Sequence, residues 1–182
     1  MEILRFLTEN PLDMIKDFGL PWMGLLMKII IPMVMTFLIA GYIGLERQNV
    51  GKAAGLSVHL LVGLASVGIA IMQRLIYESQ LDLIFQGIAV HAESQRIIAQ
   101  VVTGVGFIGA GVILKSSNNT IRGITTAGTI WAVSMVSLII GSGYLVLGGI
   151  LGFAMVAFIT FRDLKRGINP LKKLPGDRED HA

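Results

Sequence analysis

Polar and ionisable side chains interrupt the apolar segments of this sequence at two levels. One group, which we call the inner cluster, comprises Glu46, Arg47, His59, Arg122, Thr125 and Thr126. A second group, the outer cluster, comprises Arg74, Glu93, Arg96 and Gln100. Ionisable groups are costly in an apolar environment, so where they occur they often mark a functional site. We therefore treat both clusters as candidate functional residues.

Glu46 is the one carboxylate of the inner cluster, and a carboxylate in a poorly hydrated site needs a partner. Arg122 offers bidentate geometry and stays charged, so we expect an ion pair between Glu46 and Arg122. Arg47 is the rival partner, although adjacent residues on a helix point about 100° apart. His59 is expected within reach of the pair, either as a buried hydrogen-bonding group or as a functional one.

Catalytic and metal-binding chemistry finds little support in these residue types. The three histidines are His59, His91 and His181, and none has a serine and an acid in a recognisable arrangement. A magnesium site usually takes one or two carboxylates plus further oxygen ligands, and each cluster offers a single carboxylate. Zero cysteines exclude disulfides and thiolate metal sites. We expect a non-enzymatic protein with no resident metal or cofactor.

The composition indicates an integral membrane protein. Hydrophobic residues make up 53% of the 182 residues and charged residues only 15%, whereas soluble domains average about 25% charged. The high hydrophobicity also excludes a disordered chain. The net charge of +3 comes from scattered basic residues, so nucleic-acid binding is not expected. Residues 1–21 lack the basic start and apolar core of a signal peptide.

Five apolar stretches have the length of about 17–25 residues that a membrane-spanning helix needs. They predict an all-α, compact bundle of five transmembrane helices within residues 22–161. Residues 1–21 are predicted to form an interfacial segment, and residues 162–182 form a basic tail. Pro32 is expected to kink the first helix. The predicted spans are 22–45, 56–76, 97–114, 124–140 and 144–161.

The distribution of lysine and arginine predicts the orientation of this bundle, since these residues are enriched on the cytoplasmic side. Five spans place the termini on opposite sides. One side carries ten lysines and arginines, six of them in the C-terminal tail, and the other side carries five. We therefore expect the N-terminus outside and the C-terminus in the cytoplasm.

Small residues recur along the predicted spans. Gly104, Gly106 and Gly109 formally match a dinucleotide-binding fingerprint, but they lie inside an apolar run, and no acid follows them up to residue 142. Close helix packing explains them better, although some glycine faces could instead serve subunit contacts, and we expect a homo-oligomer. The residues expected to pack helices together are Gly55, Gly63, Gly104, Gly106, Gly109, Gly111, Trp131, Gly148 and Gly152.

Three ordered blocks of sequence resemble the MgtC/SapB family of bacterial membrane proteins. The first runs from Gly44 to His59, the second from Glu93 to Ile113, and the third from Arg122 to Trp131. The chain departs from the family where Glu93 replaces the usual Asp and Ser57 the usual Arg. Many members also carry a cytoplasmic C-terminal regulatory domain, and this sequence resembles the short members that lack it.

The resemblance implies a multi-pass protein of the bacterial inner membrane linked to magnesium homeostasis, stress and acid adaptation and, in pathogens, virulence. Family members are regarded as modulators of other membrane machinery, including ATP synthase, and not as proven magnesium transporters. Our first hypothesis is therefore a non-enzymatic modulator acting through helix contacts. The alternative is a channel or transporter-like conduit for a cation, proton or small solute between the two clusters.

Overall fold

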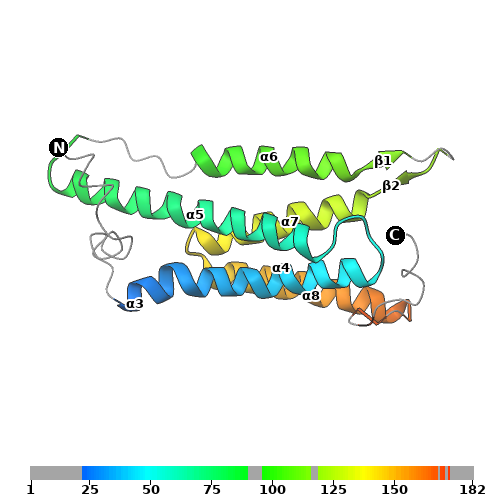
Figure 1. The fold of residues 1–182 in the computed structure, drawn as a ribbon. Helices are drawn as coiled ribbons and strands as arrows, with labels where there is room; N and C mark the ends of the chain where they lie inside the picture. Colours follow the sequence, from blue (N-terminus) through cyan, green and yellow to red (C-terminus); the bar gives the residue numbers. More distant parts are fainter. Residues whose placement is uncertain (1–21, 90–95, 116–118, 168, 171, 173–182) are drawn as a thin grey trace, which may run out of the picture.

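The computed structural model describes residues 22–89, 96–115, 119–167, 169–170 and 172, and these residues form a bundle of long helices (Figure 1). In chain order they are α3 (Trp22–Leu25), η1 (Leu26–Ile30), α4 (Ile31–Asn49), α5 (Leu56–Phe85), α6 (Arg96–Val112), α7 (Ile124–Gly141) and α8 (Leu145–Lys165). The interfacial segment predicted for residues 1–21 lies outside the described residues. So do Glu93 and most of the basic tail.

The first predicted span is one continuous helix made of α3, η1 and α4, and Pro32 shapes its middle. Proline cannot donate a backbone hydrogen bond, and its ring crowds the carbonyl four residues earlier, which here belongs to Lys28. The helix responds by widening to a π-turn over Leu26–Ile30, so that the N–H of Ile31 donates to the carbonyl of Leu26. The Lys28 carbonyl instead accepts a hydrogen bond from Nη2 of Arg74 on α5.

Within the described residues, four helices are long and apolar enough to cross a membrane: Met23–Asn49, Leu56–Phe85, Ile124–Gly141 and Leu145–Lys165. They cover the first, second, fourth and fifth predicted spans. α5 continues nine residues past the predicted end at residue 76. With 30 residues, α5 is about 45 Å long and exceeds a hydrocarbon layer of about 30 Å. The helix α6, in place of the third span, is shorter at 17 residues.

A short antiparallel hairpin between α6 and α7 was not predicted. Its strands are β1 (Leu114–Lys115) and β2 (Ile121–Arg122), and Leu114 pairs with Arg122. Gly123 then turns the chain into α7 with a φ of 90°, in the left-handed region that glycine adopts without strain. A side chain there would collide with the backbone of Val112 and Ile113.

The helices α5 and α7 form the centre of the bundle, with α6 on one side and α4 and α8 on the other (Figure 1). Glycines allow the close approaches. A Cβ added at Gly63 of α5 would lie 3.0 Å from Ala40 Cβ and 3.3 Å from a methyl group of Val133. A Cβ at Gly55 would lie 3.0 Å from Gln48. Gly148 and Gly152 of α8 likewise pack against isoleucines of α7 and α4. These four packing predictions are confirmed.

The packing predictions on α6 are largely wrong for the single chain. This helix contacts its neighbours through the side that carries Val101, Val105, Gly109 and Val112, and residues on its other faces point outward. A Cβ added at Gly104, Gly106 or Gly111 would meet no described atom within 4 Å. The prediction failed because small residues indicate that another helix approaches closely, but they do not identify which helix that is.

Trp131 was also predicted to pack in the core, and this is wrong. It is 46% exposed on α7. The side of α7 that faces the interior carries Ile130, Val133 and Ser134 instead, all of which are buried.

Candidate functional site

Glu46 and Arg47 form a buried ion pair in the last turn of α4. Both are among the largest fully buried side chains of the described residues, with exposed fractions of 0% and 1%. Arg47 folds back so that Nη2 donates to Glu46 Oε1 at 2.5 Å and Nε donates to Oε2. The arrangement is bidentate, the geometry in which a guanidinium binds a carboxylate best.

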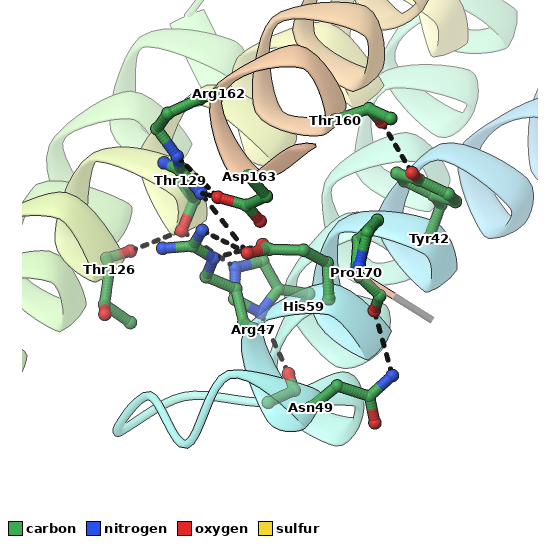
Figure 2. A network of polar contacts seen from close by, with 12 residues as sticks. Tyr42, Arg47, Asn49, His59, Thr126, Thr129, Thr160, Arg162, Asp163 and Pro170 are labelled. Carbon is green, nitrogen blue, oxygen red and sulfur yellow. Dashed lines mark hydrogen bonds and ion pairs between the residues drawn. The ribbon is translucent and has the colours of Figure 1, made fainter. Parts of the chain in front are cut away.

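The last turn of α8 brings a second arginine and a second acid to this pair (Figure 2). Nη2 of Arg162 lies 3.2 Å from Glu46 Oε1 and 2.8 Å from Asp163 Oδ1. Nε of Arg162 also donates to Asp163 Oδ1 at 2.8 Å. Two arginines therefore balance two carboxylates, and Arg162 bridges both acids. We call these four residues, Glu46, Arg47, Arg162 and Asp163, the ionic cluster.

Asp163 is as deeply placed as Glu46, with an exposed fraction of 1%. Its second oxygen, Oδ2, has no hydrogen-bond partner in the part of the chain that the structure describes. An unsatisfied buried carboxylate oxygen is costly, so Asp163 depends on Arg162 for its stability in this position.

His59 lies one layer further into the bundle on α5 and is fully buried. Its Nδ1 donates to the carbonyl of Gly55 at 2.9 Å, and its Nε2 lies 3.1 Å from the hydroxyl of Thr129 on α7. Thr129 in turn bonds to the carbonyl of Thr126 at 2.8 Å. Figure 2 draws this chain of contacts from His59 through Thr129 to Thr126.

The structure brings four of the six predicted inner-cluster residues together: Glu46, Arg47, His59 and Thr126. The predicted ion pair between Glu46 and Arg122 is wrong. Arg122 is exposed on strand β2, and Thr125 is exposed in the first turn of α7. The hairpin moves Arg122 out of the helix that would have aimed it at Glu46, and Arg47 takes its place.

Sequence reasoning missed Arg162 and Asp163, which it assigned to the basic tail. A signal was present, since an acid directly follows an arginine where the last apolar segment ends. Charges in that position also suit a helix end in water. Only the contact between α8 and α4 shows that these charges form a buried site and not a helix end in water.

The outer cluster is dispersed in the described residues. Arg74 bonds to the Lys28 carbonyl, and its Nε lies 4.0 Å from Glu78 Oε1. Glu78 is engaged more closely by Lys28, at 2.6 Å. Arg96 and Gln100 are exposed at the start of α6. Glu93 lies outside the described residues, so its predicted alignment with Gln100 stays a prediction.

A buried polar seam runs along α5 and α7 beyond the ionic cluster. His59, Ser66 and Gln73 recur every seven residues on α5 and are all buried, which places them on one face of the helix. Ser66 bonds to Ser134 of α7 at 2.7 Å. Among the described residues, no three His, Cys, Asp or Glu side chains gather in a way that could hold a metal ion.

Comparison with known proteins places these residues in context. A sequence profile of the MgtC family matches residues 33–166. The chain is 42% identical over 121 residues to YhiD of Escherichia coli strain K12, named as a candidate magnesium transporter, covering 66% of this chain and 54% of YhiD. It is 33% identical over 108 residues to protein MgtC of Brucella abortus, covering 59% of this chain and 40% of that protein.

Protein SrpB of Synechococcus elongatus is 34% identical over 154 residues, covering 80% of this chain and 79% of SrpB. The chain thus spans about half the length of YhiD and most of SrpB. No solved structure matches. The profile match contains the whole ionic cluster as well as His59 and the polar seam.

Proposed function

Because the chain belongs to the MgtC family, we propose that it is a multi-pass protein of the bacterial inner membrane that modulates other membrane machinery in magnesium homeostasis. Family membership and four apolar helices support a membrane protein related to magnesium homeostasis. The modulator role, the location and the absence of enzymatic activity are our proposal.

One observation carries this proposal: the interior of the bundle is closed, while the outer face of α6 carries glycines with open space around them. Inside, the charges of the ionic cluster are paired with one another. Apolar contacts separate the polar layers of the seam, because Gly63 packs against Ala40 and Val133 between His59 and Ser66. A protein arranged in this way is suited to contact other helices rather than to carry solutes.

The open face lies on α6. Gln100, Gly104, Phe107 and Gly111 follow one another at spacings of three and four residues, and all are exposed. Small residues let a second helix approach closely in lipid. We propose that this face, the α6 face, is the contact surface for a membrane protein complex, for which the family resemblance suggests ATP synthase, and that the protein also forms homo-oligomers.

We further propose that all five predicted spans cross the bilayer, including the short α6, with the N-terminus outside. A spanning helix can be as short as about 17 residues, and α6 is 17 residues long. The excess of lysine and arginine at the end of the chain supports a cytoplasmic C-terminus.

Substituting one glycine of the α6 face tests the modulator proposal. Gly104→Leu adds a side chain in open space, so the protein should insert and remain stable while losing its complex and its ability to restore growth at low magnesium. Gly68→Leu on α5 is the matched control, since a Cβ there also meets no described atom within 4 Å. Full function of Gly104→Leu, or equal losses in the two variants, would contradict the proposal.

A conduit is the second candidate function, and the polar seam favours it. Three buried polar residues at seven-residue intervals could line a path between the two ends of α5. The test is ion-gradient-driven flux into liposomes containing the purified protein. Flux that is abolished by Glu46→Gln would support the conduit, and the modulator proposal predicts no such flux.

A further inference from the structure

A hollow of about 310 Å³, lined by both polar and apolar side chains, lies between α5, the start of α6 and the turn that joins α7 to α8. Arg74 and Tyr77 of α5 line it, together with Ser142 and Tyr144 of the turn. The hollow is separate from the ionic cluster, since it lies towards the opposite end of α5. Gln73, Ala70 and Ile98 complete the lining. The guanidinium and the three hydroxyl groups of this lining are donors suited to an anion.

The charge of Arg74 is only partly neutralised by its neighbours. Among the described residues, its nearest carboxylate oxygen is Oε1 of Glu78, 4.0 Å away, and Lys28 holds the other oxygen of Glu78 at 2.6 Å. These three described side chains therefore carry a net charge of one positive unit. Nε of Arg74 is buried and has no hydrogen-bond partner within the described part of the chain.

The backbone of α4 holds this arginine in place. Pro32 cannot bond to the Lys28 carbonyl, and Nη2 of Arg74 donates to it instead. On the other side, the guanidinium lies over Gly143, where an added Cβ would be 2.9 Å from Nη1. The guanidinium is thus fixed at the hollow before any ligand arrives, which lowers the entropic cost of binding.

The position of the hollow along α5 indicates where its ligand lies. Arg74 is 18 residues beyond Leu56, the first residue of α5, or about 27 Å along the helix axis. A hydrocarbon layer is about 30 Å thick. Arg74 therefore lies near the far edge of that layer, where tyrosine side chains such as Tyr77 and Tyr144 are also favoured.

We propose that this hollow binds a phosphate group, and that the source of the phosphate is the headgroup of a phospholipid in the outer leaflet. Arginine matches phosphate oxygens in a bidentate fashion, and the hydroxyl groups of Ser142 and Tyr144 supply further donors. The volume falls at the lower end of the range for small-molecule sites, about 300–1,000 Å³. This inference goes beyond the proposed function and does not depend on which complex the protein contacts.

The test uses the full chain purified in a neutral detergent and counts bound lipid by native mass spectrometry over a lipid titration. Phosphatidylglycerol should bind saturably, with one tight site per chain, and diacylglycerol, which lacks the phosphate, should not. Arg74→Gln should weaken the binding of phosphatidylglycerol by about tenfold or more, as expected for the loss of a charged hydrogen-bonding partner. Lys52→Gln is the control, because Lys52 is exposed in the loop before α5, at the opposite end of that helix from Arg74. The affinity of this variant should equal that of the unchanged protein.

Two milder variants keep the test informative if Arg74→Gln fails to fold. Ser142→Ala and Tyr144→Phe each remove a single hydroxyl group, and each should weaken phosphatidylglycerol binding several-fold. Saturable binding of inorganic phosphate that depends on Arg74 would support the phosphate site while assigning it to a free anion. Equal binding of diacylglycerol and phosphatidylglycerol, or affinities unchanged in all three variants, would overturn the proposal.

Discussion

Removing Arg47 is the sharpest perturbation of the ionic cluster. Arg47 supplies two of the three nitrogen–oxygen contacts that the structure records for Glu46, and Arg162 supplies the third. Breaking a buried ion pair by removing one partner typically costs about 3–5 kcal/mol. Because Arg162 stays in contact with Glu46, we expect Arg47→Met to lower the free energy of unfolding by about 3 kcal/mol, the lower end of that range.

The partner substitution separates ionic coupling from lost packing. Glu46→Gln alone leaves Arg47 buried without its full counter-charge and should also destabilise the fold. The double variant, Glu46→Gln with Arg47→Met, removes both charges. Replacing both members of a buried pair is often close to neutral, so its loss should be clearly smaller than the sum of the single losses.

The assay is reversible unfolding of the purified protein in mixed micelles, followed by circular dichroism. Arg122→Met is the matched control, since Arg122 is exposed on β2, and it should change stability by no more than about 0.5 kcal/mol. Strictly additive losses in the double variant, or a loss at Arg122 equal to that at Arg47, would refute this description of the cluster.

Two further predictions concern topology and packing. Single cysteines at Gln86 and at Ala53, both exposed between helices, should react differently with an impermeant thiol reagent in intact cells. Gln86→Cys should be labelled and Ala53→Cys should be protected. The reverse pattern would contradict the proposed orientation. In thermal unfolding, Gly63→Leu should destabilise the bundle strongly because Ala40 and Val133 already crowd that position. Gly111→Leu should be nearly neutral in the same assay. Comparable losses of stability at both glycines would show that Gly111 does not face outward.

The helices were predictable from the sequence because hydropathy and length set them directly. The second predicted span begins at the observed first residue, Leu56, and the fourth, at 124–140, matches Ile124–Gly141 within one residue. The end of α5 was not predictable in the same way. Residues 77–85 are too polar for the hydrocarbon layer, yet nothing in them stops a helix in water.

The end of the bundle at which the candidate site lies was predictable, but the ion-pair partner of Glu46 was not. Glu46 and His59 stood out because charge and imidazole are rare in apolar segments. The partner of Glu46 depends on how α8 returns to α4 and on a hairpin that carries Arg122 away, and both are tertiary features. Likewise, the glycines of α6 and α8 look alike in sequence, and only the fold shows that Gly152 packs inside while Gly104 faces outward.

Site-specific photo-cross-linking from the α6 face tests the central claim most directly. Phe107 is 83% exposed on that face, and Phe153, 74% exposed on α8, is the matched position elsewhere. In cells grown at low magnesium, a photoreactive residue at position 107 should give one discrete protein adduct that disappears when Gly104→Leu is added, while position 153 should give none. An absence of adduct at position 107, or the same adducts from both positions, would contradict the claim that this protein acts through its α6 face.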